Sequence, residues 1–182
     1  AFDTTVSYTE NGVPIVIDAN ATVIDVDSAN LAGGKLTVQL IANGQGTDRL
    51  SIRSLGTNTG QIGVEGTNVS YGGVVIGTFT GTTSLIVTLN ANATPLAAQA
   101  LLRNLTFHNV SENPSTLSRT VRVMLTDGDG GVSNLPTKTI NVIAVNGIKQ
   151  LIRFFNQIFF QRKMRLLFVP RTAFRAAQIG NY

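Results

Sequence analysis

The sequence predicts an all-β domain of the sandwich type. Glycine is abundant, with 18 residues, while charged residues make up only 13% of the chain. Together with frequent β-branched residues, this composition favours strands joined by many turns. Short runs of alternating apolar and polar residues recur along the chain, separated by turns rich in Gly and Asn. Short strands at such regular spacing are typical of two packed antiparallel sheets.

The first predicted strand carries Val6 and Tyr8, and a break at Asn11-Gly12 separates it from a second run through Ile15. Asp48 and Arg49 adjoin a later turn, where we expect a local ion pair or turn rather than a ligand. Further strands are predicted over residues 22–27, 36–41, 50–52, 84–89, 105–110, 120–125 and 137–145, with short β runs between 61 and 80 that turn at Tyr71-Gly72-Gly73.

One helix interrupts this pattern, over about residues 95–103. Thr94 is suited to cap its first turn, and Pro95 is suited to its first position. Good helix formers follow. We expect Leu101 and Leu102 to pack over an open end of the sandwich.

Charge divides the chain into two parts. Residues 1–146 hold seven Lys/Arg and all ten acids, so their net charge is −3, whereas residues 147–182 hold the other seven basic residues and no acid. The first part is the predicted β-sandwich domain. Nothing in this part suggests nucleic acid as a partner, because such binding needs a basic face on the folded domain, and we predict none.

The tail, residues 147–182, contains six of the nine phenylalanines. Its apolar residues follow helical spacing to about Phe168, which predicts a cationic amphipathic helix. One interpretation is that this helix binds a partner or, through residues 147–170, a membrane surface. The other is that the tail is not native domain sequence, for example read-through in a shifted frame, and the abrupt change of composition favours this second interpretation.

No continuous apolar run approaches the roughly 18 residues that a membrane-spanning helix needs. The chain begins with Ala1 rather than Met and shows no signal peptide, so we expect it to be a piece of a longer protein. The absence of cysteine excludes disulfides, zinc fingers, iron-sulfur sites and cysteine proteases. The one histidine, His108, has no serine motif or acid beside it, and we predict no enzymatic activity.

An acidic, glycine-rich loop over residues 125–133 joins the last two predicted strands. Asp127 and Asp129 stand one residue apart among glycines, and their carboxylates are oxygen ligands of the kind that calcium prefers. Asp-Gly pairs also make ordinary turns, so both interpretations stay open. An EF-hand is excluded, because the twelfth position counted from Asp127 is Lys138 rather than Glu. A calcium-binding β-helix is excluded because its repeat is not in tandem.

A second pair of carboxylates, Asp25 and Asp27, lies on the predicted strand over residues 22–27. Residues two apart on a strand share a face, so these carboxylates stand roughly 7 Å apart, while Ile24 points to the other face. The pair belongs either to a solvent-exposed strand face or to a cation site at the end of the strand.

Several segments along the body occur in an order that resembles a known family. It is similar to the cadherin-like tandem repeats of very large secreted or surface proteins of bacteria, including adhesins and hemolysin-type calcium-binding proteins. The segments that carry the resemblance are residues 8–14, 26–30, 94–104, 111–115, 125–133 and 142–146.

The resemblance implies an immunoglobulin-like or cadherin-like Greek-key β-sandwich with a calcium site. In such repeats an Asp-x-Asp on the second strand meets an Asp of the last hairpin at one end, which implicates Asp25, Asp27 and Asp127. Asp129 is a weaker candidate, and Glu10 resembles the acid that serves the opposite end and the next repeat. The Asp-containing linker that usually follows Val-Asn is absent here, since 147–150 reads Gly-Ile-Lys-Gln.

We therefore expect a calcium-binding structural repeat of an extracellular or cell-surface bacterial protein, acting as a spacer or an adhesion module. Its partners would be neighbouring repeats of the same chain and cell-surface or matrix ligands. The alternatives are a carbohydrate-binding module, membrane binding through the tail, and a hydrolase with paired carboxylates. A sugar platform usually needs exposed aromatic rings, and the body has no Trp.

Overall fold

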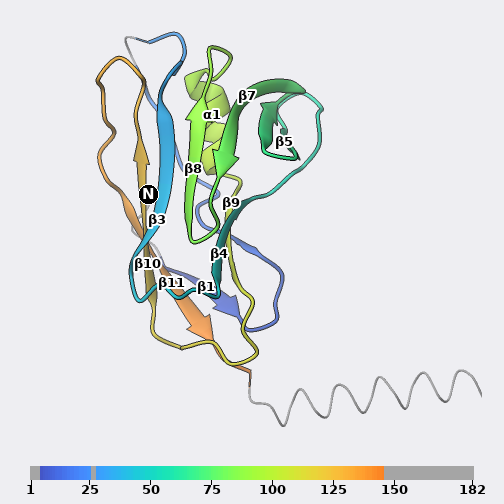
Figure 1. Cartoon of the computed structure of the whole chain (residues 1–182), viewed down its shortest axis with the longest axis vertical. Helices are drawn as coiled ribbons and strands as arrows, with labels where there is room; N and C mark the ends of the chain where they lie inside the picture. Colours follow the sequence, from blue (N-terminus) through green and yellow to red (C-terminus); the bar gives the residue numbers. More distant parts are fainter. Residues whose placement is uncertain (1–4, 26–27, 146–182) are drawn as a thin grey trace, which may run out of the picture. The chain divides into compact units, whose positions relative to one another are not determined.

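A computed structural model of the chain describes residues 5–25 and 28–145 (Figure 1). The chain divides into two compact units, Ala1–Ala144 and Val145–Tyr182. The tail helix predicted up to about Phe168 lies outside the described residues, as does Asp27. The fold below is that of the first unit.

The described part of this unit is mostly β, with one helix, as predicted. Its eleven strands form two sheets. The larger sheet has eight strands in the order β1 (Thr5–Thr9), β11 (Thr137–Ile143), β10 (Arg119–Leu125), β3 (Lys35–Ala42), β8 (Ser84–Leu89), β7 (Val74–Thr80), β6 (Asn68–Tyr71) and β5 (Ile62–Glu65). The smaller sheet has the order β2 (Ile15–Val16), β9 (Leu105–Asn109) and β4 (Asp48–Ile52).

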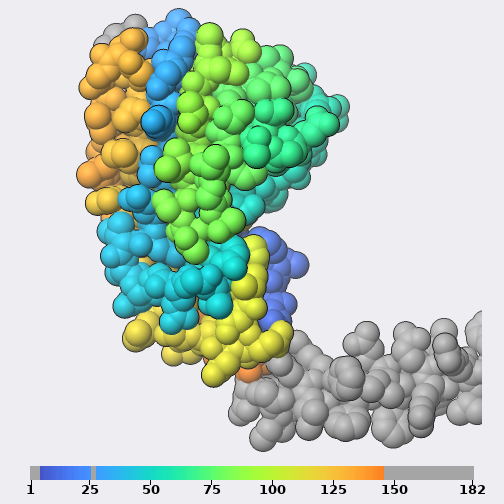
Figure 2. Space-filling model, viewed as in Figure 1, coloured from blue at the N-terminus to red at the C-terminus, as the bar shows by residue number. Residues whose placement is uncertain are grey.

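The strand directions define two ends of the larger sheet. β1 runs parallel to β11, and every other neighbouring pair is antiparallel. β10 therefore stops where β11 starts, and we call this the Asp127 end. β1 and β11 both stop at the other end, which we call the Glu10 end. Figure 2 shows the orange C-terminal strands beside blue β3, and Figure 1 shows β7 bending so that β5 turns away from β8.

The core lies where inward side chains of the two sheets meet. Tyr8 of β1 packs edge-on against Phe107 of β9, with ring centroids 5.6 Å apart, and its hydroxyl donates a hydrogen bond to the backbone oxygen of Asn109 at 2.9 Å. The predicted alternation in β10 is confirmed, because Val121, Val123 and Leu125 are buried between half-buried neighbours. These contacts agree with the predicted all-β sandwich.

The predicted helix is confirmed as α1 (Pro95–Leu102). The Thr94 side chain accepts a hydrogen bond from the backbone N–H of Ala97 at 3.2 Å, and Pro95 occupies the first turn. Leu101 and Leu102 are buried, so the helix contributes its apolar face to the core.

The predicted strand over residues 22–27 is wrong for its described part. Residues 21–25 form no strand, and Ile24, which alternation places in the core, is 85% exposed. The physical reason is that the backbone of this segment bonds to side chains rather than to a neighbouring strand. Arg103 Nε donates to the Ala21 oxygen at 2.8 Å, and the Gln99 side chain accepts from the Val23 N–H at 3.3 Å, so helix side chains hold the segment.

Candidate functional site

The loop between β10 and β11 folds around the carboxylate of Asp127. Its Oδ1 accepts hydrogen bonds from the backbone N–H groups of Asp129, at 2.8 Å, and Gly131, at 2.9 Å. A Cβ added at position 131 would come within 2.0 Å of Asp127 Oδ2, so a side chain there would require this carboxylate to shift. The loop is thus an Asp-centred turn, as one of the two interpretations of the sequence expected.

This loop packs closely against residues 31–34, which precede β3. Thr126 and Lys35 exchange hydrogen bonds, from Thr126 N–H to the Lys35 oxygen at 2.9 Å and from Lys35 N–H to Thr126 Oγ1 at 2.8 Å. A Cβ on Gly34 would lie 2.0 Å from the Thr126 oxygen, and one on Gly128 would lie 2.0 Å from the Ala32 oxygen. The two loops therefore meet backbone to backbone at the Asp127 end.

Asp25 and Asp127 line the same cavity, of about 220 Å³. Asp25 is half-buried, and its Oδ1 accepts a hydrogen bond from the Ser28 N–H at 3.0 Å. Residues about a hundred positions apart in the sequence thus bring two carboxylates to one small space. The apolar side chains of Val23, Leu31 and Leu125 form much of the rest of its lining.

The other predicted site residues lie elsewhere. Asp129 is exposed and does not line this cavity. Glu10 is buried at the Glu10 end, directly after β1, where its N–H donates to the Ile143 oxygen at 2.9 Å. Over residues 5–25 and 28–145, no three acidic or histidine side chains gather in a way that would hold a metal ion.

The cavity offers carboxylate oxygens, which calcium prefers as ligands, but only two side chains supply them. Two carboxylates in one partly apolar space repel each other, and a divalent cation relieves that repulsion. Calcium takes 6–8 oxygen ligands, so Asp25 and Asp127 supply only part of a shell. Backbone oxygens or water would have to supply the rest.

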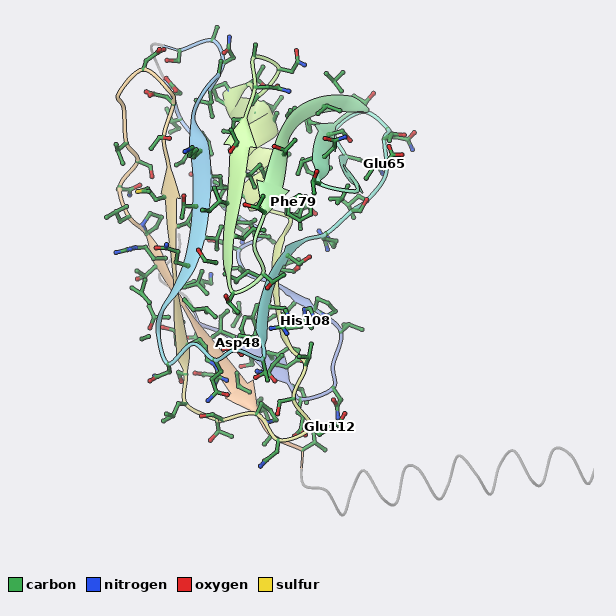
Figure 3. All side chains as sticks on the ribbon, in the orientation of Figure 1. Asp48, Glu65, Phe79, His108 and Glu112 are labelled. Atoms are coloured by element: carbon green, nitrogen blue, oxygen red, sulfur yellow. The ribbon has the colours of Figure 1, made fainter. Side chains whose placement is uncertain are left out.

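A buried ion pair at the Glu10 end was missed by the sequence analysis. Asp48 of β4 pairs with Arg119 of β10, with Arg119 Nε 3.2 Å from Asp48 Oδ2 and both side chains fully buried. Of the two expectations for Asp48 and Arg49, the ion pair is wrong, because Arg49 donates to the backbone oxygens of Gly46 and Asp48. The turn is confirmed, because the Asp48 N–H donates to the Gln45 oxygen at 3.0 Å and the Asp48 carboxylate accepts from the Gln45 N–H at 2.8 Å. Figure 3 shows Asp48 near this end of the fold, in the same region as Glu112.

Both residues of this pair make further hydrogen bonds. Arg119 Nη1 donates to the backbone oxygens of Ser115, at 2.6 Å, and Leu117, at 2.5 Å. Asp48 accepts from the Asn109 side chain at 2.6 Å and from the Gln45 N–H at 2.8 Å. The network ties both sheets to two loops, which points to a structural role for Asp48.

The single histidine lies on the outer face of the smaller sheet, directly across from Arg49. Burial, and secondarily the Arg49 guanidinium, lower the pKa of His108 from its ordinary value of 6.5. The unfolded chain then takes up a proton at higher pH than the folded chain does. His108 should therefore lower the free energy of unfolding as pH falls from about 6.5 through the folded pKa.

We expect His108→Gln to flatten this part of the pH dependence. The measurement is urea unfolding of both proteins between about pH 7.5 and about pH 5, where His is the side chain with an ordinary titration. As pH falls, the free energy of unfolding of His108→Gln should rise relative to that of the unaltered protein. Parallel curves would contradict the pKa direction.

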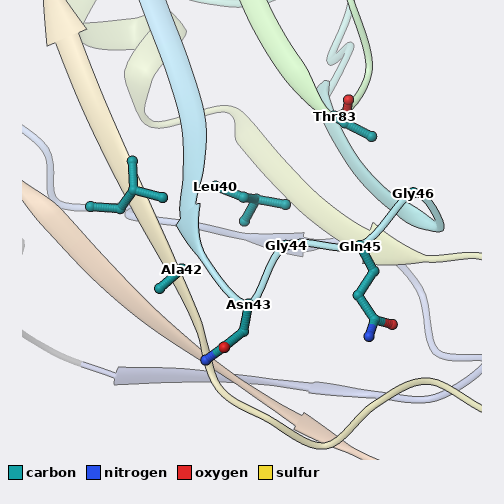
Figure 4. Close-up of a pocket in the computed structure, with 8 residues that line it drawn as sticks. Leu40, Ala42, Asn43, Gly44, Gln45, Gly46 and Thr83 are labelled. Carbon is teal, nitrogen blue, oxygen red and sulfur yellow. The ribbon is translucent and has the colours of Figure 1, made fainter.

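One further cavity and the exposure of the aromatic rings bear on the hydrolase and carbohydrate-binding alternatives. The turn from β3 to β4 holds a cavity of about 380 Å³, but Asn43, Gln45 and the other residues that line it include no titratable group (Figure 4). Among the described aromatic residues, Tyr71 and Phe79 are half-buried and Tyr8 and Phe107 are buried. The described part of the chain thus presents no exposed ring to stack on a sugar.

No family model, curated protein or solved structure matches this chain. None of the described helical structure is long and apolar enough to span a bilayer.

Proposed function

We propose that the unit is a structural, calcium-binding repeat of a large extracellular bacterial protein, acting as a spacer or an adhesion module. The observation that carries the proposal is the cavity at the Asp127 end, which both Asp25 and Asp127 line. We further propose that the two sheets form a cadherin-like Greek-key sandwich. No catalytic role is assigned to any residue.

The path of the chain supports the proposal that the unit acts as a spacer. β1 starts beside Thr139, near the start of β11, and pairs in parallel with β11 up to Ile143. The first described residues therefore enter at the Asp127 end, and the last strand leaves at the Glu10 end. Repeats joined in this way lie end to end, so a load along the protein passes through each unit from one end to the other.

The positions of the acids support a role at the joints. Asp25 and Asp127 lie at the entry end, and Glu10 lies at the exit end beside Ile143. A cation held by the entry end of one repeat and the exit end of the preceding one would bridge the joint. Such a bridge would stiffen the joint, because calcium orders the oxygen groups that ligate it.

Calcium titration by calorimetry tests this proposal. We expect a dissociation constant of about 0.1–1 mM, as for other extracellular calcium modules. The double variant Asp25→Asn/Asp127→Asn should lose the heat of binding, while the matched control Asp129→Asn should keep it. If Asp129→Asn loses the heat of binding and the double variant keeps it, the cation lies elsewhere. If the unaltered chain shows no heat of calcium binding, the proposal is contradicted.

A further inference from the structure

A second buried pair of opposite charges, Asp18 and Lys138, joins the two sheets. Asp18 follows β2 by two residues, and the Ile17 N–H between them donates to the Leu105 oxygen of β9 at 2.9 Å. Lys138 is on β11, on the face that also buries Ile140. The two side chains are 4% and 3% exposed, so bulk water is largely excluded from both.

The two oxygens of the Asp18 carboxylate differ in environment. Oδ1 accepts a hydrogen bond from the Asn20 N–H at 2.9 Å. Oδ2 has no hydrogen-bond partner among the described residues and lies 3.8 Å from Lys138 Nζ. That separation exceeds a normal N–H···O hydrogen bond, which is about 2.7–3.2 Å. The amine and the carboxyl group are thus close together in a dry site, but they are not joined by a hydrogen bond.

The other buried pair makes the contrast clear. Asp48 accepts hydrogen bonds at both oxygens, from Arg119, Asn109 and Gln45. That is how a buried ion pair offsets the cost of removing its charges from water. Within residues 5–25 and 28–145, Asp18 Oδ2 makes no such bond. An ion pair therefore accounts for the burial of Asp48 but accounts poorly for the burial of Asp18.

We propose that Asp18 and Lys138 condense to an isopeptide bond, a side-chain amide that links the segment after β2 to β11. A proton passes from the Lys138 ammonium group to Asp18 Oδ2, which leaves a neutral amine beside a neutral acid. Nζ then adds to Cγ, a second hydrogen moves from Nζ to Oδ2, and Oδ2 leaves as water. Both hydrogens of that water come from the ammonium group, so the reaction needs no oxidant, reductant or co-reactant.

The surroundings of the carboxyl group favour this reaction. The Asn20 N–H points at Oδ1, the oxygen that would become the amide oxygen and carries negative charge while Nζ adds. Burial brings the reacting groups together in a fixed geometry and removes the water shells that stabilise their charged forms.

The bond would give the unit a covalent path for load. It connects the segment after the first strands directly to the last strand, so the chain between residues 18 and 138 would be bypassed when the ends are pulled. The inference does not depend on calcium, because no residue of the Asp127 cavity takes part.

The intact mass of the purified full chain tests the proposal. We expect it to fall short of the sequence mass by one water. Trypsin should then release one branched peptide, residues 1–35 joined to residues 123–149, because an acylated Lys138 is not cleaved. A full sequence mass, with ordinary cleavage after Lys138, would overturn the proposal and leave the pair as an ion pair.

Variants at positions 18 and 138 test whether these two residues form the bond. Lys138→Arg and Asp18→Ala should both restore the full mass expected for each variant. Asp18→Asn should still condense, now with loss of ammonia, and give a product identical to the crosslinked parent. A water lost as a cyclic imide at Asp127-Gly128 has the same mass. It would be mapped to residues 127–128 and reversed by mild base, and that result would also overturn the proposal.

Discussion

Replacing Arg119 with Met is expected to lower the free energy of unfolding by about 3–5 kcal/mol, the usual cost of removing one partner from a buried ion pair. The variant leaves the Asp48 carboxylate buried without its counter-charge. It also leaves the backbone oxygens of Ser115 and Leu117 without their donor. Urea unfolding followed by circular dichroism measures the change.

Arg122→Met is the matched control on the same strand. Arg122 is half-buried and donates to the Gln39 side chain at 3.2 Å, with no buried acid as partner. Its loss should cost less than about 1 kcal/mol, in the range of surface substitutions. Equal losses for the two variants would show that the Asp48 network does not hold the sheets together.

Gly128→Ala should cost about 2–4 kcal/mol, while Gly130→Ala should cost about 1–3 kcal/mol, the range for a residue held in an unfavourable backbone region. Both glycines have positive φ, +92° and +106°, so alanine is strained at either position. Only position 128 adds a collision, because its Cβ would lie 2.0 Å from the Ala32 oxygen, whereas nothing lies within 4 Å at position 130.

The difference between these two variants isolates the packing of the two loops at the Asp127 end. If Gly128→Ala destabilises no more than Gly130→Ala, residues 32–34 do not pack closely against the acidic loop. The cavity that Asp25 and Asp127 line would then lack the loop packing that forms it. Thermal unfolding of both variants in chelator, without calcium, makes the comparison independent of any bound cation.

Period-2 patterns in the sequence were sufficient to predict most strands and the turn between β6 and β7. Thr94 and Pro95 were sufficient to predict α1. These features are local, and here the fold agrees with local preference. The segment over residues 21–25 shows the limit, because its partners are the side chains of Gln99 in α1 and of Arg103 directly after it, which lie 76 and 82 positions away in the sequence.

The buried polar residues were missed although the pattern contained a signal for them. Arg119 continues the inward period of Val121 and Val123, and Lys138 continues that of Ile140, so strict alternation places both in the core. Lys and Arg are almost never fully buried unless they are paired, so charge by itself argues against such a position. Their partners, Asp48 on β4 and Asp18 just after β2, are distant in the sequence, and no local pattern indicates which charge meets which.

The candidate site was predictable only in part. The turn chemistry of the Asp127 loop follows from its Asp-Gly sequence, but the meeting of Asp25 and Asp127 depends on how residues 31–34 pack against that loop. The position of Glu10 at the opposite end follows from the parallel pairing of β1 and β11, which no local pattern specifies.

The most direct test of calcium binding at the Asp127 end is a thermal melt of the full chain in chelator and in calcium. At about 10 mM calcium, a dissociation constant of about 0.1–1 mM would raise the free energy of unfolding by about 1.4–2.7 kcal/mol. The account predicts a rise of several degrees that Asp25→Asn/Asp127→Asn abolishes and Asp129→Asn retains. An unchanged melting temperature, or a rise that the double variant keeps, would contradict it.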